Sequence, residues 1–297
     1  MLISVVIPTF QRPAALAACL DCLQRQALPR DRFEVIVPDD GGDPASREMV
    51  AKKFPWAKWT QGPRRGPAAN RNHGASLAKG DWIAFVDDDC LPAAGWLKAI
   101  AAQSDVDVIE GKTVSPGARD TPFEERVENL RGGCYWSCNL AVRSPAFELL
   151  GGFDEDFREP AGEDMEFAWR IAANNLHTRF VPAALVEHPP RPVAWKQIWA
   201  RTWRIRWIVL YRLKTGQAAP LRASWITVVV SAIKREIAGL LRSSLRYFTV
   251  FDATLWRTKL FHQFWNWVTF PLVLPWLLWW EIRFRTALRS AKPRALA

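Results

Sequence analysis

The sequence predicts an α/β fold, in which a Rossmann-like, mostly parallel sheet is flanked by helices and followed by an all-α C-terminal extension. In roughly the first 90 residues, short apolar runs alternate with helical stretches of about 10–15 residues, a pattern typical of βαβ units. From Arg191 onward the strand signals nearly vanish. The length of 297 residues suits about two domains. We therefore expect one domain over residues 1–190 and another over residues 191–297.

The spacing of apolar residues predicts the elements of the first domain in order. Strands are expected at 2–7, 33–37, 56–60 and 82–86, of which the third is weak. The helices between them are expected at 14–26, 43–54 and 67–79. After Ala93 the order is mixed, with strands at 106–113, 137–142 and 178–186 and helices at 123–130 and 162–173. Ligands of such sheets bind beyond the carboxyl ends of the strands.

Charge divides the chain at the same place. The whole sequence has a net charge of +10, but residues 1–190 contain 21 Lys and Arg against 27 Asp and Glu. Residues 191–297 contain 19 Lys and Arg against 3 acidic residues, and 11 of the 17 tryptophans follow Val193. The acidic first part excludes a uniformly basic nucleic-acid-binding protein. It indicates instead that the two parts have different tasks.

The cysteines and the N-terminus favour a cytoplasmic location. Five cysteines are an odd number, and their spacing shows neither a disulfide framework nor a usual zinc motif. The first residues, Met1–Pro8, have no basic region before a short apolar run, which is typical of a first buried strand rather than of a leader peptide. We expect reduced thiols in a reducing compartment.

Polar clusters follow three of the predicted strands, at 9–12, 39–42 and 87–89. The last is a run of three aspartates, whose mutual repulsion amounts to about 1 kcal/mol per pair at ~4 Å even in water. A divalent cation removes this repulsion, and Mg²⁺ in proteins typically binds one or two carboxylates together with substrate phosphates. An isolated acidic triplet can equally be a solvated turn. Its position at the end of a strand favours the metal site.

Two acidic residues and one histidine in the second half of the domain have the same ambiguity. Glu163 and Asp164 open a predicted helix, where acidic residues commonly complement the helix dipole but can also act as a general base. His188 follows a predicted strand, where an imidazole can complete a carboxylate metal site. Arg71 lies in a polar stretch at 70–74 and could bind a nucleotide or remain solvated.

In order and spacing, these motifs resemble family 2 glycosyltransferases with the GT-A fold. The matching stretches are 4–13, 39–41, 69–74, 85–89, 137–143, 151–154, 162–164 and 187–188. Each motif is weak by itself, whereas the ordered set over about 190 residues is specific. The resemblance implies transfer of a sugar from a nucleotide-sugar to an acceptor hydroxyl, with inversion at the anomeric carbon.

The resemblance also implies a role for each matching residue. Asp164 matches the base that takes the proton of the acceptor hydroxyl. Asp87 and Asp89 match the family's Asp-x-Asp motif, and we expect Asp89 and His188 to bind a divalent metal ion, Mn²⁺ or Mg²⁺. The residues expected around the nucleotide-sugar are Thr9, Arg12, Asp40, Arg71, Asp87 and Asp88. The residues expected on the acceptor side are Trp136, Asn139 and Glu163.

Two departures from the family pattern refine these expectations. Gly42 stands where the family more often has Ser after Asp-Asp-Gly, so the ribose contacts are less firmly implied. The Gln-x-x-Arg-Trp signature of processive polysaccharide synthases is absent, since Gln197 and Arg201 are one residue too far apart. We therefore expect addition of one or a few sugars rather than processive polymerisation.

The second domain is predicted to lie at a membrane surface. Trp195, Trp199, Trp203 and Trp207 recur every fourth residue and share one broad helical face. A second apolar helix is expected over 223–245. The last apolar run, 268–280, contains Trp276, Trp279 and Trp280 but has only 13 residues, whereas a spanning helix needs about 20. We expect this run to be re-entrant or interfacial.

Tryptophan on one helix face and basic residues on the other are typical of helices in the interface of an anionic membrane. The alternative is that these tryptophans form the core of a helical extension or a homo-oligomer interface. Nucleic-acid binding is disfavoured because the apolar runs are too long for it.

The predicted function is a non-processive, inverting glycosyltransferase at the cytoplasmic face of a membrane. Its donor would be a UDP, GDP or dTDP sugar, and its acceptor a lipid-linked or membrane-surface glycan in the synthesis of envelope polysaccharide. Two alternatives remain at this point: a metal-dependent nucleotidyltransferase on a related scaffold, and a non-catalytic membrane-bound scaffold that keeps the fold.

Overall fold

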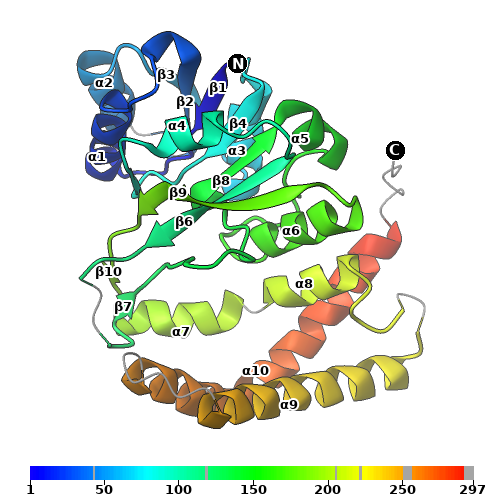
Figure 1. The fold of residues 1–297 in the computed structure, drawn as a ribbon. Coiled ribbons are helices and arrows are strands. Elements are labelled where there is room, and N and C mark those ends of the chain that lie inside the picture. Colours follow the sequence, from blue (N-terminus) through cyan, green and yellow to red (C-terminus); the bar gives the residue numbers. More distant parts are fainter. Residues whose placement is uncertain (43, 118–119, 205, 221–222, 250–255, 291–297) are drawn as a thin grey trace. The chain divides into compact units, whose positions relative to one another are not determined.

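An eight-stranded mixed sheet organises the N-terminal part of the chain (Figure 1). The computed structural model describes the chain except for residues 43, 118–119, 205, 221–222, 250–255 and 291–297. The described residues form two compact units. The first unit contains residues 1–117 and 126–190, and the second contains residues 118–125 and 191–297.

The order of the strands in the sheet is β3-β2-β1-β4-β8-β6-β9-β5. Their bounds are Ile3–Val6 (β1), Phe33–Asp39 (β2), Lys58–Gln61 (β3), Trp82–Phe85 (β4), Leu91–Pro92 (β5), Val108–Val114 (β6), Leu140–Arg143 (β8) and Thr178–Glu187 (β9). The strands β1 to β4 pair in parallel, β8 pairs antiparallel with β4 and β6, and β9 is parallel to β6 but antiparallel to β5. The prediction of a largely parallel sheet is confirmed for its N-terminal half, and β5 and β8 make the rest mixed.

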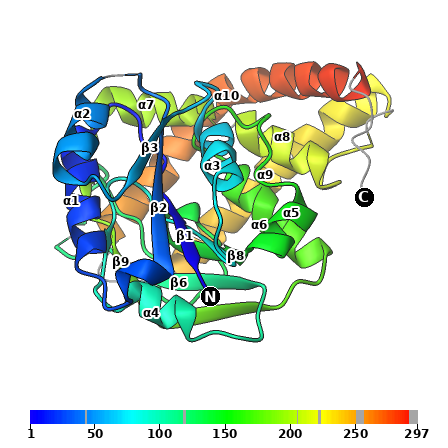
Figure 2. The ribbon, with the colours of Figure 1, turned by 90° about the horizontal axis from the view of Figure 1, so that it is seen from above.

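Helices cover both faces of the sheet because the strands are apolar on both faces. Alternate residues of β1 belong to two cores: Val5 packs on the side of α1 (Pro13–Gln24), and Val6 packs on the side of α3 (Pro67–Ser76). The first core also includes residues of α2 (Pro44–Lys53) and α4 (Trp96–Ala101), and the second includes residues of α5 (Ser144–Leu150) and α6 (Glu163–Ala173). Figure 2 shows α1 and α2 on one side of the strands and α3, α5 and α6 on the other. Two single 3-10 turns, at Arg30–Arg32 and Ser137–Asn139, complete the unit.

One predicted element of this region is wrong. The stretch 123–130 is not a helix: Glu124–Glu125 forms the short strand β7, and Asn129 bridges Thr113. Backbone hydrogen bonds are made here with distant segments, since β7 lies antiparallel to β10 (Arg191–Pro192). Such long-range pairing overrides a weak local helical pattern.

The second unit is helical, with bounds Trp195–Arg204 (α7), Arg206–Lys214 (α8), Trp225–Thr249 (α9) and Trp256–Ser290 (α10). A small apolar core joins α8 to α10 through Val209, Leu213, Val273 and Leu277. Ion pairs link the helices as well: Arg235 of α9 lies 2.9 Å from Glu281 of α10. The apolar run 268–280 forms no separate segment, because α10 continues through both of its prolines for 35 residues.

The tryptophans predicted to face a membrane divide into exposed and packed groups. Trp195, Trp199 and Trp279 are exposed, whereas Trp207 is buried and packs near Phe284 at 5.9 Å between ring centroids. The partly buried ones are Trp203, Trp276 and Trp280. Among the described helices, none combines the length and the apolar character that a bilayer crossing requires.

Candidate active site

The sheet topology gathers the predicted polar clusters at one edge. The parallel strands β1, β2 and β4 end there, so Thr9, Asp39 and Asp87 follow neighbouring strand ends. The antiparallel strand β8 begins at the same edge, because its first residue, Leu140, pairs with the last residue of β4. The strand β9 runs parallel to β6 and ends just before His188.

A hydrogen-bonded network involving Thr9 and Arg12 orders the aspartate triplet. The Thr9 hydroxyl donates to Asp88 Oδ2 at 2.7 Å, and Arg12 Nη1 donates to Asp88 Oδ1 at 3.2 Å and to Asp89 Oδ2 at 2.6 Å. Asp88 is buried, and this burial raises its pKa to about 6 against the opposing effects of Arg12 and Thr9. The hydrogen bonds of buried Asp88 therefore fix the conformation of the triplet, while Arg12 neutralises part of its charge.

Arg71 connects the end of β4 to the start of α6. Its buried guanidinium donates to Asp87 Oδ1 at 2.9 Å and to Glu163 Oε1 at 3.5 Å. Burial by itself would lower the pKa of Arg71, but the carboxylates of Asp87, Asp164 and Glu163 outweigh it and raise the pKa. Arg71 is therefore a fixed cation between the strand that ends in the aspartates and the helix that begins with the acidic pair.

The acidic pair at the start of α6 lies in a poorly solvated environment. Burial, reinforced by the charge of Asp164, raises the pKa of Glu163 to about 8 although Arg71 opposes the shift. Burial also raises the pKa of Asp164, against Arg71 and the hydrogen bonds that the Ser137 hydroxyl and N–H make to it. Asp164 Oδ1 is buried and has no hydrogen-bond partner among the described residues. This combination makes Asp164 the candidate proton acceptor of the site.

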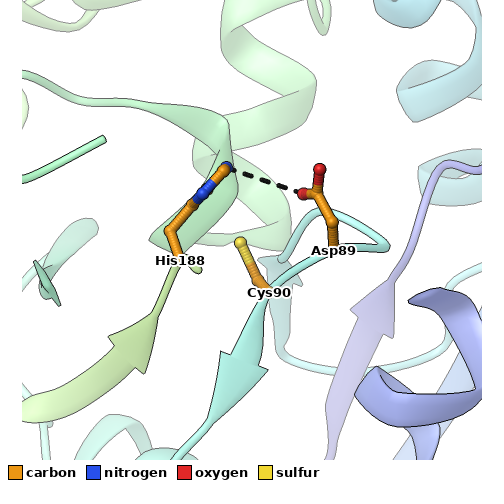
Figure 3. A group of neighbouring side chains, drawn as sticks. All are labelled: Asp89, Cys90 and His188. Atoms are coloured by element: carbon orange, nitrogen blue, oxygen red, sulfur yellow. Dashed lines mark ion pairs between the residues drawn. The ribbon is translucent and has the colours of Figure 1, made fainter. Parts of the chain in front are cut away.

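Asp89 and His188, which we predicted as metal ligands, lie side by side (Figure 3). The distance from His188 Nε2 to Asp89 Oδ1 is 3.6 Å, and Cys90 adds a third ligand atom within 4.8 Å of the other two. Because the Pro189 carbonyl can only accept, its 3.3 Å contact with His188 Nδ1 places a proton on Nδ1, while Nε2 faces the carboxylate. An imidazole nitrogen and a carboxylate oxygen arranged in this way can bind a divalent cation.

Two of the predicted residues, Asp40 and Asn139, make hydrogen bonds within the protein. Asp40 accepts hydrogen bonds from the backbone N–H groups of Arg64 and Gly66 at 2.7 and 3.2 Å, so it shapes the loop before α3. Asn139 is buried, where it accepts from Trp96 Nε1 at 2.9 Å and donates to two backbone carbonyls. Any contribution of Asn139 to the acceptor side would therefore be indirect. Trp136 is partly buried against the core on the α1 side of the sheet.

The structure brings in three residues that the sequence analysis did not single out. Ser137 hydrogen bonds to Asp164, and buried Glu110 accepts from the backbone N–H groups of three successive residues, 133–135. Cys90 joins the metal ligands. Only Cys90 had a usable signal in the sequence, since a sulfur ligand directly follows the acidic run at a strand end. Nothing local marks Ser137 or Glu110, because their partners are distant in the chain.

Comparison with known proteins relates the N-terminal part of this chain to a known family. The glycosyl transferase family 2 model matches residues 4–145. The pre-mycofactocin glycosyltransferase of Mycobacterium tuberculosis is 28% identical over 243 residues, which cover 74% of this chain and 47% of that protein. The chain therefore spans about half the length of this curated relative.

Solved structures share the fold. S. aureus TarS in complex with UDP gives a TM-score of 0.55 at 22% identity, covering 84% of this chain and 72% of that chain. The mannosyltransferase PcManGT from Pyrobaculum calidifontis, in complex with GDP-Man and Mn²⁺, gives a TM-score of 0.51 at 19% identity and covers 99% and 76%, respectively. At these identities the likeness establishes the GT-A fold. The chain therefore has the GT-A fold, and its residues 4–145 are similar in sequence to glycosyl transferase family 2.

Proposed function

We propose that this protein is an inverting, non-processive glycosyltransferase that moves a sugar from a nucleotide-sugar to an acceptor hydroxyl. One observation carries the proposal: Asp164 Oδ1, which has no hydrogen-bond partner among the described residues, lies at the same edge of the sheet as the Asp87–Asp89 triplet and His188. Arg71 connects the two groups, because it pairs with Asp87 and interacts with the charge of Asp164. A proton acceptor can activate the acceptor hydroxyl, and a cation-binding group at the same edge can hold the leaving diphosphate. Together they are suited to direct displacement at the anomeric carbon of a sugar. A nucleotidyltransferase whose nucleophile is an ionised phosphate oxygen would need no base at the start of α6.

In this proposal the chain's own residues bind, orient and deprotonate the reactants. Asp164 Oδ1 takes the proton of the acceptor hydroxyl, and its raised pKa makes it a stronger base than an ordinary aspartate. Ser137 fixes the orientation of the carboxylate by hydrogen bonding to it. Arg71 keeps Asp164 ionised, because a fixed cation favours the charged form of a nearby carboxyl group.

The donor diphosphate would lie beside the aspartate triplet. Asp89 and His188 would hold a divalent metal ion, Mn²⁺ or Mg²⁺, which when bound supplies charge stabilisation to the leaving diphosphate. Arg12, which pairs with Asp88 and Asp89, is half-exposed and can move its guanidinium toward phosphate oxygens. Thr9 and Asp40 line the neighbouring strand ends and are the remaining candidates for contacts to the nucleoside.

A panel of nucleotide-sugars tests the proposal. The melting temperature of the full chain is measured with UDP, GDP and dTDP sugars, each with and without Mn²⁺, and the bound donors are then tested for sugar transfer. We expect a metal-dependent rise with at least one donor, because a ligand that binds only the native state stabilises it by mass action. No metal-dependent rise with any donor would contradict the proposed activity.

We further propose that the acceptor is a lipid-linked or membrane-surface glycan of the cell envelope, reached at the cytoplasmic face of a membrane. The support comes from exposed apolar side chains on two helices. On α9 they are Ile226, Val230, Ile237 and Leu241, and on α10 they are Leu260, Phe264, Trp267, Val268, Leu272 and Trp279. Their spacing of three, four or seven residues along much of each helix marks a stripe on one face. Exposed apolar stripes on a strongly basic unit are suited to the interface of an anionic bilayer.

A further inference from the structure

The metal-binding edge contains a sulfur atom that the proposed reaction does not require. We propose that Cys90 is a third ligand of the cation held by Asp89 and His188, so that the site binds thiophilic divalent ions such as Co²⁺ and Zn²⁺ more tightly than Mg²⁺. This inference rests on the proposed function only in placing the cation at Asp89 and His188. We call these three residues the Asp89–Cys90–His188 cluster.

Strand pairing imposes the proximity of Cys90 and His188. The strands β5 and β9 are antiparallel, with Leu91 opposite Glu187 and Pro92 opposite Val186. The next pair in this register is Cys90 opposite His188. The sulfur, a His188 ring nitrogen and a carboxylate oxygen of Asp89 all lie within 4.8 Å of one another, and Figure 3 shows the sulfur pointing into the space between the other two side chains.

The surroundings of the cluster favour a bound cation over a simple packing role. Cys90 is fully buried and His188 is 2% exposed, whereas Asp89 opens to solvent with 12% of its side chain exposed. A buried cysteine usually behaves as a small apolar residue, and Cys90 also hydrogen bonds with Cys138. An apolar role does not require a carboxylate oxygen and an imidazole nitrogen beside the same sulfur atom.

The donor set determines which ions gain from the sulfur. Carboxylate and imidazole suit Mn²⁺ and Mg²⁺ as well as softer ions, whereas thiolate selects softer ions. On binding, the metal–sulfur bond forms as the thiol proton leaves to solvent, and no oxidation state changes. Mg²⁺ gains little from sulfur and is expected to bind through oxygen and nitrogen alone.

Cobalt provides a direct test on the full chain without donor or acceptor. Co²⁺ is titrated into wild-type protein, into C90S, and into C138S as a matched control that removes the neighbouring buried thiol. We expect a thiolate-to-cobalt charge-transfer band in the near ultraviolet for wild type and for C138S. For C90S we expect loss of that band and Co²⁺ affinity lower by about tenfold or more, with little change in Mg²⁺ affinity.

Co²⁺ binding without a charge-transfer band in wild type, or with the same band in C90S, would overturn the proposal. If C90S is poorly folded by circular dichroism, H188Q decides instead: a sulfur-containing site requires the band of wild type to weaken or shift when the nitrogen ligand is lost. These outcomes are separate from turnover. A chain that transfers sugar but shows no band refutes only the sulfur ligand, and one that shows the band but transfers no sugar refutes only the proposed function.

Discussion

At the scale of single residues, three consecutive aspartates have three different environments. Asp87 pairs with Arg71, Asp88 is buried beneath the loop, and Asp89 faces His188. The side chains diverge because the strand ends at Phe85 and a tight turn follows, in which Cys90 N–H donates to the Asp87 carbonyl. One sequence motif thereby contributes an ion-pair partner for Arg71, a buried hydrogen-bond acceptor and a candidate metal ligand.

The substitution Asp164→Asn is expected to abolish most transfer while leaving donor binding nearly unchanged. The amide keeps the shape and the hydrogen bonding with Ser137 but cannot accept a proton, and a general base contributes roughly 10²–10⁴-fold to a rate. The measurements are the transfer rate and the donor dissociation constant. Asp105→Asn, an exposed carboxylate that pairs with Arg179, is the matched control. Turnover at the wild-type rate in Asp164→Asn would remove Asp164 as the base.

The raised pKa of Glu163 makes stability depend on pH. An unfolded glutamate titrates near 4.3, whereas the pKa of Glu163 in the folded chain is about 8. The folded state therefore binds this proton more tightly than the unfolded state does. Each unit of pKa difference contributes about 1.4 kcal/mol to the free energy of unfolding. This contribution is complete below pH ~4 and is lost as pH rises through about 8. Burial also raises the pKa of Asp164, so this residue adds to the same decline, while Arg71 keeps its charge throughout.

Glu163→Gln mimics the neutral form and is expected to flatten this decline. Its free energy of unfolding, measured by denaturant titration between pH 5 and 9, should exceed that of wild type increasingly toward high pH. The exposed Glu148→Gln serves as control and should follow wild type. Parallel curves for wild type and Glu163→Gln would show that Glu163 is not protonated preferentially in the folded state.

At the scale of elements, the segment before β8 depends on a single buried carboxylate. Glu110 of β6 accepts from the N–H groups of Gly133, Cys134 and Tyr135, and from the Asn129 side chain, at 2.5–2.7 Å. Gly132, Gly133 and Tyr135 all have positive φ angles, which turn successive N–H groups toward this anion. The turn that follows contains Ser137, the partner of Asp164. Glu110 therefore helps to position Asp164 through the backbone and Ser137.

Glu110→Ala is expected to cost about 3 kcal/mol in the free energy of unfolding, because three partly buried backbone donors lose their acceptor at roughly 1 kcal/mol each. Glu110→Gln retains one acceptor oxygen and should cost less. Chemical denaturation measures both, with exposed Glu148→Ala as the control. A loss in Glu110→Ala no greater than that of the control would show that the segment 133–135 keeps its conformation without the carboxylate.

Element prediction succeeded where local pattern and tertiary context agree. The helix at 14–26 and the strands at 33–37 and 82–86 are confirmed within a few residues as α1, β2 and β4. The helix predicted at 123–130 is wrong because its residues pair with distant strands. The helices α4 and α5 were not predicted, since each is short and its apolar residues are buried against the sheet.

At the scale of the whole molecule, the basic charge belongs to the second unit and the carboxylates of the site belong to the first. Residues 191–297 have 19 Lys and Arg against 3 acidic residues, and two of those acidic residues, Glu236 and Glu281, pair with arginines. At an anionic membrane surface, a nearby basic residue contributes about 1 kcal/mol to binding. The overall net charge of +10 thus describes neither unit.

The full chain is expected to co-sediment with anionic vesicles, and less so at high salt, which screens the basic residues. A triple variant, Ile226→Ser, Phe264→Ser and Leu272→Ser, removes exposed apolar side chains of α9 and α10 and should weaken vesicle binding by at least about tenfold. Leu149→Ser, equally exposed on α5 of the other unit, is the matched control. If the triple variant binds vesicles as well as the control, these helices do not contact the membrane.

The sequence by itself determined the order of strands and helices over roughly the first 90 residues and the edge at which the polar clusters meet. Apolar periodicity is a local property, and parallel strands necessarily direct their carboxyl ends to one edge. Only the tertiary structure decided which side chains are partners at that edge. The link from Asp87 through Arg71 to Glu163, and the placement of Cys90 opposite His188, depend on strand register and on helix packing. Register is set by long-range burial and pairing, which no local pattern encodes.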